Sequence, residues 1–179
     1  MPAMISPGCE QRGRQNRAEY LTMPSFNSRR LVNHSAPQMF DLVADVERYP
    51  EFVPLCSSLK VRQRTRRHDG TEIVVCDMTV SFKLVREAFT TQVTLDRANL
   101  KILVEYLKGP FSNLENRWTF EPKPEDRCEV GFYLRYEFKS RMLAILMGTM
   151  FDTAFQRFAA AFEKRADAIY GRSSIAGRG

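Results

Sequence analysis

The chain has 179 residues, of which 44% are apolar and 27% charged, and its formal net charge is +6. This length and composition suit one globular domain with a buried core and exclude wholesale disorder. No apolar run approaches the roughly 18 residues of a transmembrane helix, and the modest charge is not that of a dedicated DNA-binding protein.

The two ends of the chain differ in composition from its middle. Residues 1–23 contain Pro2, Pro7, Gly8 and Gly13 and have no apolar period, and residues 171–179 are short and polar. We therefore expect a disordered extension over 1–23, one domain over 24–170 and a disordered tail over 171–179. Met23 is a candidate native start.

The first predicted elements are a strand and a helix. The segment 25–32 is expected to form the strand, and Ser35 caps a helix over 36–46 whose apolar residues recur at helical spacing. Tyr49-Pro50 ends this helix, because the residue before a proline avoids the helical region. Residues 50–56 then form a tight, partly apolar connection.

From residue 58 the apolar pattern changes to a period of two. Strands are expected over 58–66, 71–82, 84–96, 101–108, 114–121 and 128–138, separated by residues typical of turns. Ser140 then caps a helix over about 141–170, which Gly171 ends. This order predicts an α+β fold in which a curved antiparallel sheet of about six to seven strands wraps the long final helix and encloses a cavity.

Signatures of catalysis and of metal binding are missing from the sequence. There is no Gly-x-Ser-x-Gly, no Gly-x-Gly-x-x-Gly after a strand, no P-loop and no His-Glu-x-x-His. The two histidines, His34 and His68, are expected in surface turns, and Asp77 has the solvent-facing parity of its strand. The four cysteines are scattered, which predicts reduced thiols. These are Cys9, Cys56, Cys76 and Cys128.

Apolar residues exceed what one packed helix face needs in the first half of the long helix. Ile145, Leu146 and Phe151 must meet a cavity ligand, a membrane or the 50–56 connection. Phe52 and Phe111 suggest an apolar rim near this helix, against the simpler interpretation of loops anchored in the core. The residues expected to contact an apolar ligand are Val53, Leu55, Met78, Val80, Phe89, Tyr106, Phe111, Asn116, Trp118, Phe132, Leu134, Tyr136, Met147, Met150 and Phe151.

Four cations recur at every second position of one strand: Lys60, Arg62, Arg64 and Arg66. On a regular strand they share a face, at intervals of about 6.7 Å. Such a basic surface can contact phosphates of nucleic acid or anionic lipid head groups. It can equally protect an edge strand from pairing with another chain, so both interpretations stay open.

The segment from Tyr49 to Cys56, YPEFVPLC, resembles the Tyr-Pro-x-Phe-x-Pro-x-Cys signature of a START-like family that groups coenzyme Q-binding proteins with bacterial ribosome-association toxins. Phe89-Thr90-Thr91, Gly109-Pro110-Phe111 and Trp118-Thr119-Phe120 are also similar to it. The resemblance covers about residues 24–170. In the toxin branch the residue before the cysteine is often tryptophan, whereas here it is Leu55.

The resemblance implies a helix-grip fold of the polyketide cyclase/dehydrase type and two competing functions. The first is non-enzymatic binding of a polyprenyl quinone, with no required cofactor, in support of respiration. The second is binding of the large ribosomal subunit, which blocks subunit joining. A cyclase- or hydrolase-like enzyme that uses the same cavity is a third alternative. We expect a cytoplasmic protein, of bacterial origin in preference to a mitochondrial one, with peripheral contact to the inner membrane as an open alternative and no DNA partner.

Overall fold

The computed structural model describes residues 25–82 and 84–171, apart from the side chains of 82, 146–153, 155 and 156. The elements in chain order are β1 (Ser25–Val32), α1 (Ala36–Ala44), the 3-10 helix η1 (Val46–Arg48), α2 (Tyr49–Phe52), β2 (Cys56–Arg66), β3 (Glu72–Phe82), β4 (Val85–Asp96), β5 (Lys101–Lys108), β6 (Phe111–Lys123), β7 (Arg127–Phe138) and α3 (Arg141–Tyr170).

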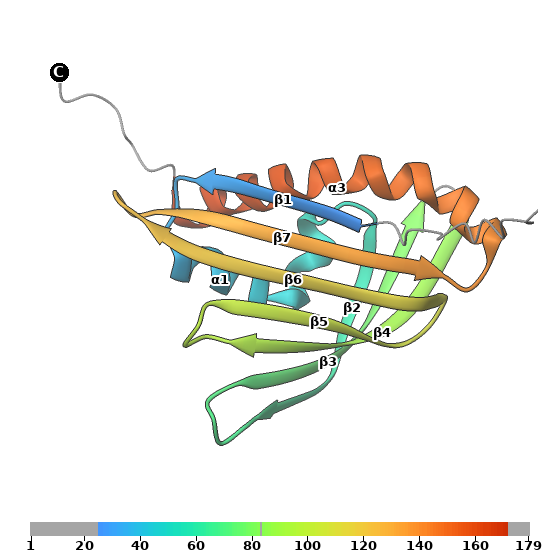
Figure 1. The fold of residues 1–179 in the computed structure, drawn as a ribbon, viewed down its shortest axis with the longest axis horizontal. Coiled ribbons are helices and arrows are strands. Elements are labelled where there is room, and N and C mark those ends of the chain that lie inside the picture. The colour runs from blue at the N-terminus through green and yellow to red at the C-terminus, as the bar shows by residue number, and fades with distance from the viewer. Residues whose placement is uncertain (1–24, 83, 172–179) are drawn as a thin grey trace, which may run out of the picture.

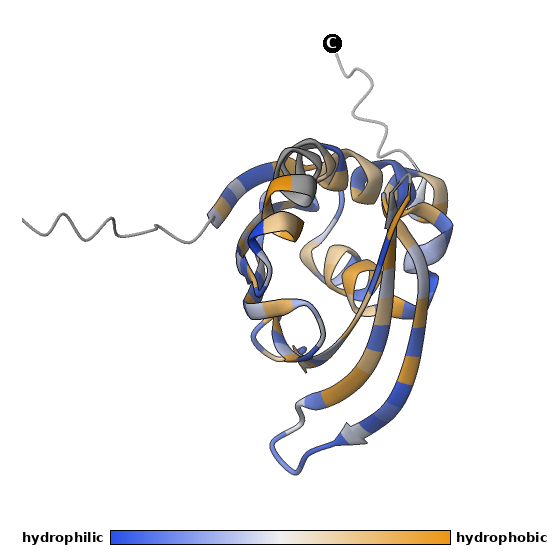
Figure 2. Cartoon of the chain, turned by 90° about the vertical axis from the view of Figure 1, so that its right-hand side faces the viewer, coloured by the Kyte–Doolittle hydropathy of each residue, from blue (hydrophilic) through white to orange (hydrophobic). Residues whose placement is uncertain are grey.

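The strands form one antiparallel sheet of seven strands in the order β1-β7-β6-β5-β4-β3-β2. The sheet curves, and α3 runs along its concave side while α1 and α2 cover one end (Figure 1). Apolar and polar residues alternate along the strands, which gives the sheet one buried and one solvated face (Figure 2). The predicted α+β class and helix-grip architecture are therefore confirmed.

The first helix begins as predicted and ends earlier. Ser35 accepts a hydrogen bond from the Gln38 amide and Gln38 reaches back to the Ser35 amide, which forms a capping box. The helix ends at Ala44, before the predicted 46, and Pro50 lies in the first turn of α2. The segment expected to be a tight connection therefore starts as a short helix, because proline suits a first helical turn.

The edge strand β2 contains a bulge that changes which face its cations occupy. Lys60 lies opposite Asp77 on the solvated face, whereas Arg64 lies opposite Val74, which is fully buried on the concave face. The register shifts between Val61 and Gln63. One extra residue at this point reverses the alternation, so the expected single row of four cations is wrong.

The long helix is capped at its start and packed against the rest of the fold near its C-terminal end. Ser140 caps its start by accepting a hydrogen bond from the Leu143 amide at 3.3 Å. Near its other end Phe162 and Ala166 are buried, and Arg165 pairs with Glu51 of α2 at 2.7 Å. Gly171 follows with a positive φ of 80°, as expected of a residue that terminates a helix.

Candidate functional site

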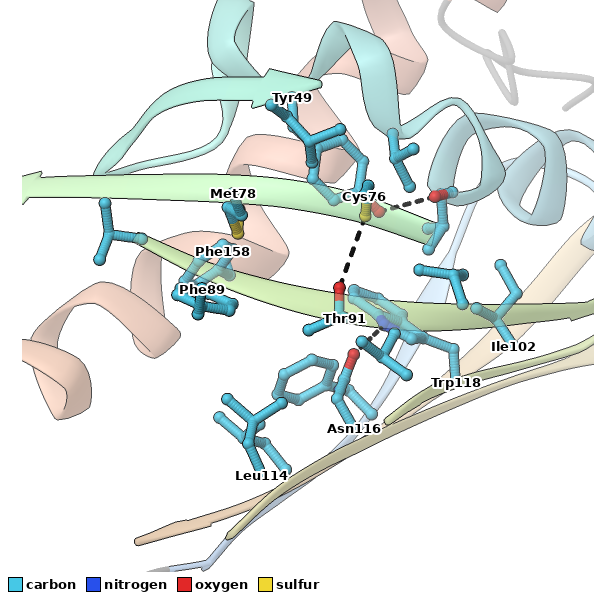
Figure 3. Close-up of a pocket in the computed structure, with 18 of the residues that line it drawn as sticks. Tyr49, Cys76, Met78, Phe89, Thr91, Ile102, Leu114, Asn116, Trp118 and Phe158 are labelled. Atoms are coloured by element: carbon cyan, nitrogen blue, oxygen red, sulfur yellow. Dashed lines mark hydrogen bonds between the residues drawn. The ribbon is translucent and has the colours of Figure 1, made fainter. Parts of the chain in front are cut away.

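A cavity of about 140 Å³ lies between the concave face of the sheet and α3 (Figure 3). Its lining is almost entirely apolar. The lining residues are Val43, Val46, Tyr49, Leu59, Cys76, Met78, Val80, Phe89, Thr91, Val93, Ile102, Val104, Leu114, Asn116, Trp118, Phe132, Leu134, Tyr136, Phe158 and Phe162.

The strands supply most of this wall because alternate side chains of one strand face the same side. On β4, for example, Phe89, Thr91 and Val93 all line the cavity. On the facing side, α3 contributes Phe158 and Phe162. The described side chains of the curved sheet and of α3 therefore leave space between them.

Tyr49 closes the end of the cavity near α1. Its hydroxyl donates to the carbonyl of Val43 at 2.6 Å, and its ring lies edge-on to Phe162 with the ring centroids 5.5 Å apart. Burial raises the pKa of Tyr49, so the phenol stays protonated and keeps this hydrogen bond. The signature tyrosine therefore acts as a fixed wall of the cavity.

Two polar pairs interrupt the apolar lining. The Cys76 thiol and the Thr91 hydroxyl lie 3.4 Å apart on neighbouring strands, and either can donate to the other. Asn116 accepts from the Trp118 indole at 2.7 Å and donates to the carbonyl of Tyr133 at 2.8 Å. Burial raises the pKa of the Cys76 thiol. The thiol–hydroxyl pair can hydrogen-bond to a ligand, whereas Asn116 already has two protein partners.

Eight of the residues predicted to contact a ligand line the cavity: Met78, Val80, Phe89, Asn116, Trp118, Phe132, Leu134 and Tyr136. Four others do not. Val53 is buried in the main core, and Phe111 is buried against Phe89, Tyr106 and Phe138, so the predicted exposed apolar rim is wrong.

The other two lie near the cavity without lining it. Leu55 has a positive φ of 67° and lies in the connection between α2 and β2. The Tyr106 ring packs on Phe111 beyond the cavity wall. The side chains of Met147, Met150 and Phe151 lie outside the described part of the structure.

Other residues that line the cavity were not among those predicted from the sequence: α1, η1 and α2 contribute Val43, Val46 and Tyr49. Also not among those predicted were Leu59, Cys76, Thr91, Val93, Ile102, Val104, Leu114, Phe158 and Phe162. The strand residues among them share the inward parity of residues that were chosen, so parity was a usable signal. The helical spacing of the apolar residues in α1 likewise marks Val43 as core-facing, whereas no such pattern marks Val46 of η1 or Tyr49 of α2.

His34 differs from its prediction because it is buried. Its side chain is 2% exposed, and Nε2 donates to Asp167 Oδ1 on α3 at 2.8 Å. Tyr170 packs beside the imidazole, and its hydroxyl donates to the carbonyl of Gln38. His34 therefore ties the β1–α1 turn to the C-terminal end of α3 and does not line the cavity.

The predicted basic surface is exposed but partly neutralised. Arg62 pairs with Asp77, and Arg64 with Glu72. Hydrogen bonds from Thr90 and then Arg62 hold the pKa of Asp77 below its ordinary value. Lys60 and Arg66 form no ion pair within the described part of the chain.

Metal-binding and membrane-spanning features can be assessed for the same residues. No group of three or more metal-ligating side chains comes together among residues 25–82 and 84–171. No helix in these ranges is long and apolar enough to span a bilayer.

Relatives of known name match nearly the whole domain. The ribosome association toxin RatA of Vibrio cholerae is 37% identical over 79% of this chain and 94% of its own length. The mitochondrial coenzyme Q-binding protein COQ10 homolog B of Xenopus laevis is 30% identical over 84% of this chain and 61% of its own length. The chain is thus similar to both branches of the resemblance noted in the sequence.

Solved structures share the fold. The 18 kDa protein CC1736 of Caulobacter crescentus is 32% identical, with a TM-score of 0.70 over 83% of this chain and 99% of its own. A START superfamily protein of Mycobacterium smegmatis has a TM-score of 0.67 at 21% identity over 81% of this chain and 98% of its own. The ZhuI aromatase/cyclase of Streptomyces sp. R1128 has a TM-score of 0.65 at 15% identity over 87% and 99%, which indicates the fold alone.

The family model for polyketide cyclase/dehydrase and lipid transport proteins matches residues 32–163. This range runs from the end of β1 into the C-terminal half of α3 and includes every residue that lines the cavity. The chain therefore belongs to the START-like polyketide cyclase/dehydrase and lipid transport family.

Proposed function

We propose that the protein binds the ring of a polyprenyl quinone, of the ubiquinone kind, in the cavity beneath α3 and supports respiratory electron transport without a catalytic step. The observation that carries this proposal is an apolar cavity with one hydroxyl–thiol pair, Thr91 and Cys76, in its wall. A quinone ring needs an apolar surround and a donor for a carbonyl oxygen, and the rotatable Thr91 hydroxyl supplies that donor.

The size of the cavity limits what it holds. A cavity of about 150 Å³ accepts a single benzene ring in other proteins, and the cavity here measures about 140 Å³. It therefore suits a single ring, and the larger ring substituents and the long prenyl tail have to extend out of it. Val80 and Phe89 line the side of the cavity towards the turn between β3 and β4. We expect the tail to leave the cavity in that direction.

The chemistry of the lining supports binding over catalysis. None of the described residues that line the cavity is an aspartate, a glutamate or a histidine. The Cys76 thiol is the one side chain among them with a nucleophilic sulfur, and burial raises its pKa and keeps it protonated. A protonated thiol also spares a bound quinone, which is electrophilic, from attack.

The test uses the single tryptophan of the chain, Trp118, which lines the cavity. A short-chain ubiquinone titrated into the purified protein is expected to quench Trp118 fluorescence with saturation. Thr91→Val is expected to weaken binding about fivefold to tenfold, the worth of one hydrogen bond. Thr94→Val, on the other face of the same strand, serves as the matched control and is expected to leave the affinity unchanged.

Variants that fill the cavity provide a second test of quinone binding. Val104→Phe places a ring inside the cavity and is expected to abolish saturable quenching. Leu103→Phe places its ring on the other face of β5 and is expected to quench like the wild type. Linear, unsaturable quenching in the wild type, or equal quenching in both variants, would rule out the quinone proposal.

Ribosome association is the second candidate, favoured by the name of the Vibrio cholerae relative and its 94% coverage. Its physical support here is the turn of the β2–β3 hairpin, where Arg66 and Arg67 are exposed and form no ion pair with a described residue. Co-sedimentation with large ribosomal subunits that falls steeply with salt and is lost in Arg66→Glu/Arg67→Glu would support it. Equal sedimentation of the variant would contradict it.

A further inference from the structure

One end of the molecule carries large apolar side chains in contact with solvent. Leu84, in the turn between β3 and β4, is fully exposed, and Ile145 and Met142 in the first turns of α3 are 78% and 72% exposed. Leu107, at the end of β5, is 51% exposed. Isolated exposed apolar residues are common, but several at one end indicate a contact surface.

The sheet topology brings these four residues to the same end. Because neighbouring strands run in opposite directions, the β3–β4 turn, the β5–β6 turn and the end of β7 all lie at the same end of the strands. The chain passes from that end of β7 into α3. Figure 1 shows these three connections together at the right of the molecule. Val85 and Leu143, the neighbours of Leu84 and Met142, pack against the same apolar cluster. We call this region the β3–β4 end.

Cations surround the apolar residues at the β3–β4 end. Arg86, Lys108, Lys139 and Arg141 are exposed, and no ion pair joins any of them to a described residue. Lys139 lies near the carbonyl of Gly109 and over the Tyr106 ring. The acids near these cations include Glu87, Glu137 and Asp77: Glu137 accepts a hydrogen bond from Ser112, and Asp77 is close enough to interact with Lys108. The surface is therefore apolar at its tips and positive around them.

We propose that the β3–β4 end docks on an anionic lipid bilayer, with Leu84, Met142 and Ile145 inserted among the acyl chains and the cations at the head groups. This inference rests on the proposed function, because a lipid leaving the cavity past Val80 and Phe89 reaches this end. Apolar side chains on two separate segments, the β3–β4 turn and the start of α3, suit a soft, deformable surface. Cations beside them complement the negative surface potential of an anionic leaflet.

Vesicle flotation tests the proposal directly. The full-length protein is expected to float with vesicles of phosphatidylglycerol and phosphatidylcholine, and to float poorly with phosphatidylcholine alone. Leu84→Asp/Ile145→Asp is expected to reduce the bound fraction about tenfold, because it places charges where apolar contact is needed. Lys108→Glu/Arg141→Glu is expected to reduce it by about fivefold or more for each cation.

The molecule offers matched controls at its opposite end. Leu31 and Ile169 are 54% and 50% exposed, and Lys101 lies at the start of β5 away from the β3–β4 end. Leu31→Asp/Ile169→Asp and Lys101→Glu are expected to float like the wild type. Equal loss in the controls, or flotation independent of anionic lipid, would overturn the proposal. So would self-association in sedimentation velocity that the Leu84→Asp/Ile145→Asp variant removes, since the surface would then join two copies.

The two proposals fail in different ways. Quenching of Trp118 by a short-chain quinone in detergent-free solution reports on the cavity alone and needs no bilayer. Normal quenching without flotation would contradict the proposed membrane-docking surface and would still support quinone binding. Flotation without quenching would leave a membrane-binding surface and remove the quinone.

Discussion

The imidazole of His34 is buried, although its sequence position predicts a surface turn. It follows a strand in a short turn and still finds Asp167, a residue 133 positions away. Because the ring is 2% exposed, its N–H has no access to bulk solvent and depends on this carboxylate. The pair is thus a structural fastening of α3 to the β1–α1 turn.

Replacing His34 tests this fastening. His34→Ala removes a buried hydrogen bond to a carboxylate and leaves a void, so the free energy of unfolding is expected to fall by about 1–3 kcal/mol in urea denaturation. His68→Ala, in the exposed β2–β3 turn, is the matched control and is expected to change it by less than about 0.5 kcal/mol. Equal effects of the two substitutions would show that burial of His34 contributes nothing.

Buried thiols predict a loss of stability in alkali. Desolvation raises the pKa of Cys56 and of Cys128 to about 11 from an ordinary value of 9.0. Between these values the unfolded chain releases thiol protons that the native chain keeps. The contribution is therefore fully present below about pH 9 and is lost as pH rises towards 11.

Urea midpoints measured at about pH 8 and about pH 10.5 check this prediction. The midpoint of the wild type is expected to fall over this interval, and Cys128→Ala is expected to show a smaller fall. A midpoint that stays constant across the interval would contradict burial of the thiols.

Among the secondary-structure elements, β2 shows where sequence patterns stop being informative. Its alternation of cations looks as regular as the alternation in β7, which the structure follows from Arg127 to Phe138. The bulge between Val61 and Gln63 depends on the register with β3. A sequence pattern describes one strand, whereas a bulge is a property of two paired strands. The single cationic face could therefore not be tested from the sequence.

The long helix predicts unequal protection along its length. Residues 141–145 expose Met142 and Ile145, whereas the C-terminal half buries Phe162 and Ala166 and pairs Glu163 with Arg30 at 3.1 Å. Backbone amides at 141–145 are therefore expected to exchange with deuterium faster than those at 158–168. Hydrogen-exchange mass spectrometry checks this, and uniform exchange along α3 would contradict it. Bilayer docking is expected to slow exchange at 141–145.

At the scale of the whole molecule, the sequence predicts the architecture better than the site. Period-two strands between two amphipathic helices favour one arrangement, and the seven-stranded sheet follows it. The cavity exists because opposed side chains leave space between them, such as Phe158 and Phe162 on α3 and Thr91 on β4. That is a matter of three-dimensional volume. The sequence thus identifies inward-facing strand residues and misses Val43, Val46 and Tyr49.

Ligand binding is expected to stabilise the whole fold, because the cavity exists only when the sheet and α3 are assembled. A short-chain quinone at about 100 times its Kd raises the free energy of unfolding by about 2.7 kcal/mol. A thermal shift that grows with ligand concentration checks this. The cavity-filling variant Val104→Phe is expected to show none, and a shift in that variant equal to the wild type would place the ligand elsewhere.

The pairing of β1 with β7 bears on how the protein is made. Ser25 lies opposite Arg135 and Val32 opposite Cys128, so the first strand has to wait for its partner until most of the polypeptide has been synthesised. Until β7 is available, the unpaired backbone groups of β1 can pair with a wrong strand. A nascent chain that stalls before residue 138 lacks a complete β7, and one that stalls before residue 167 lacks the Asp167 carboxylate that pairs with His34. The cavity can therefore form only after α3, which contributes Phe158 and Phe162 to its wall, has been synthesised.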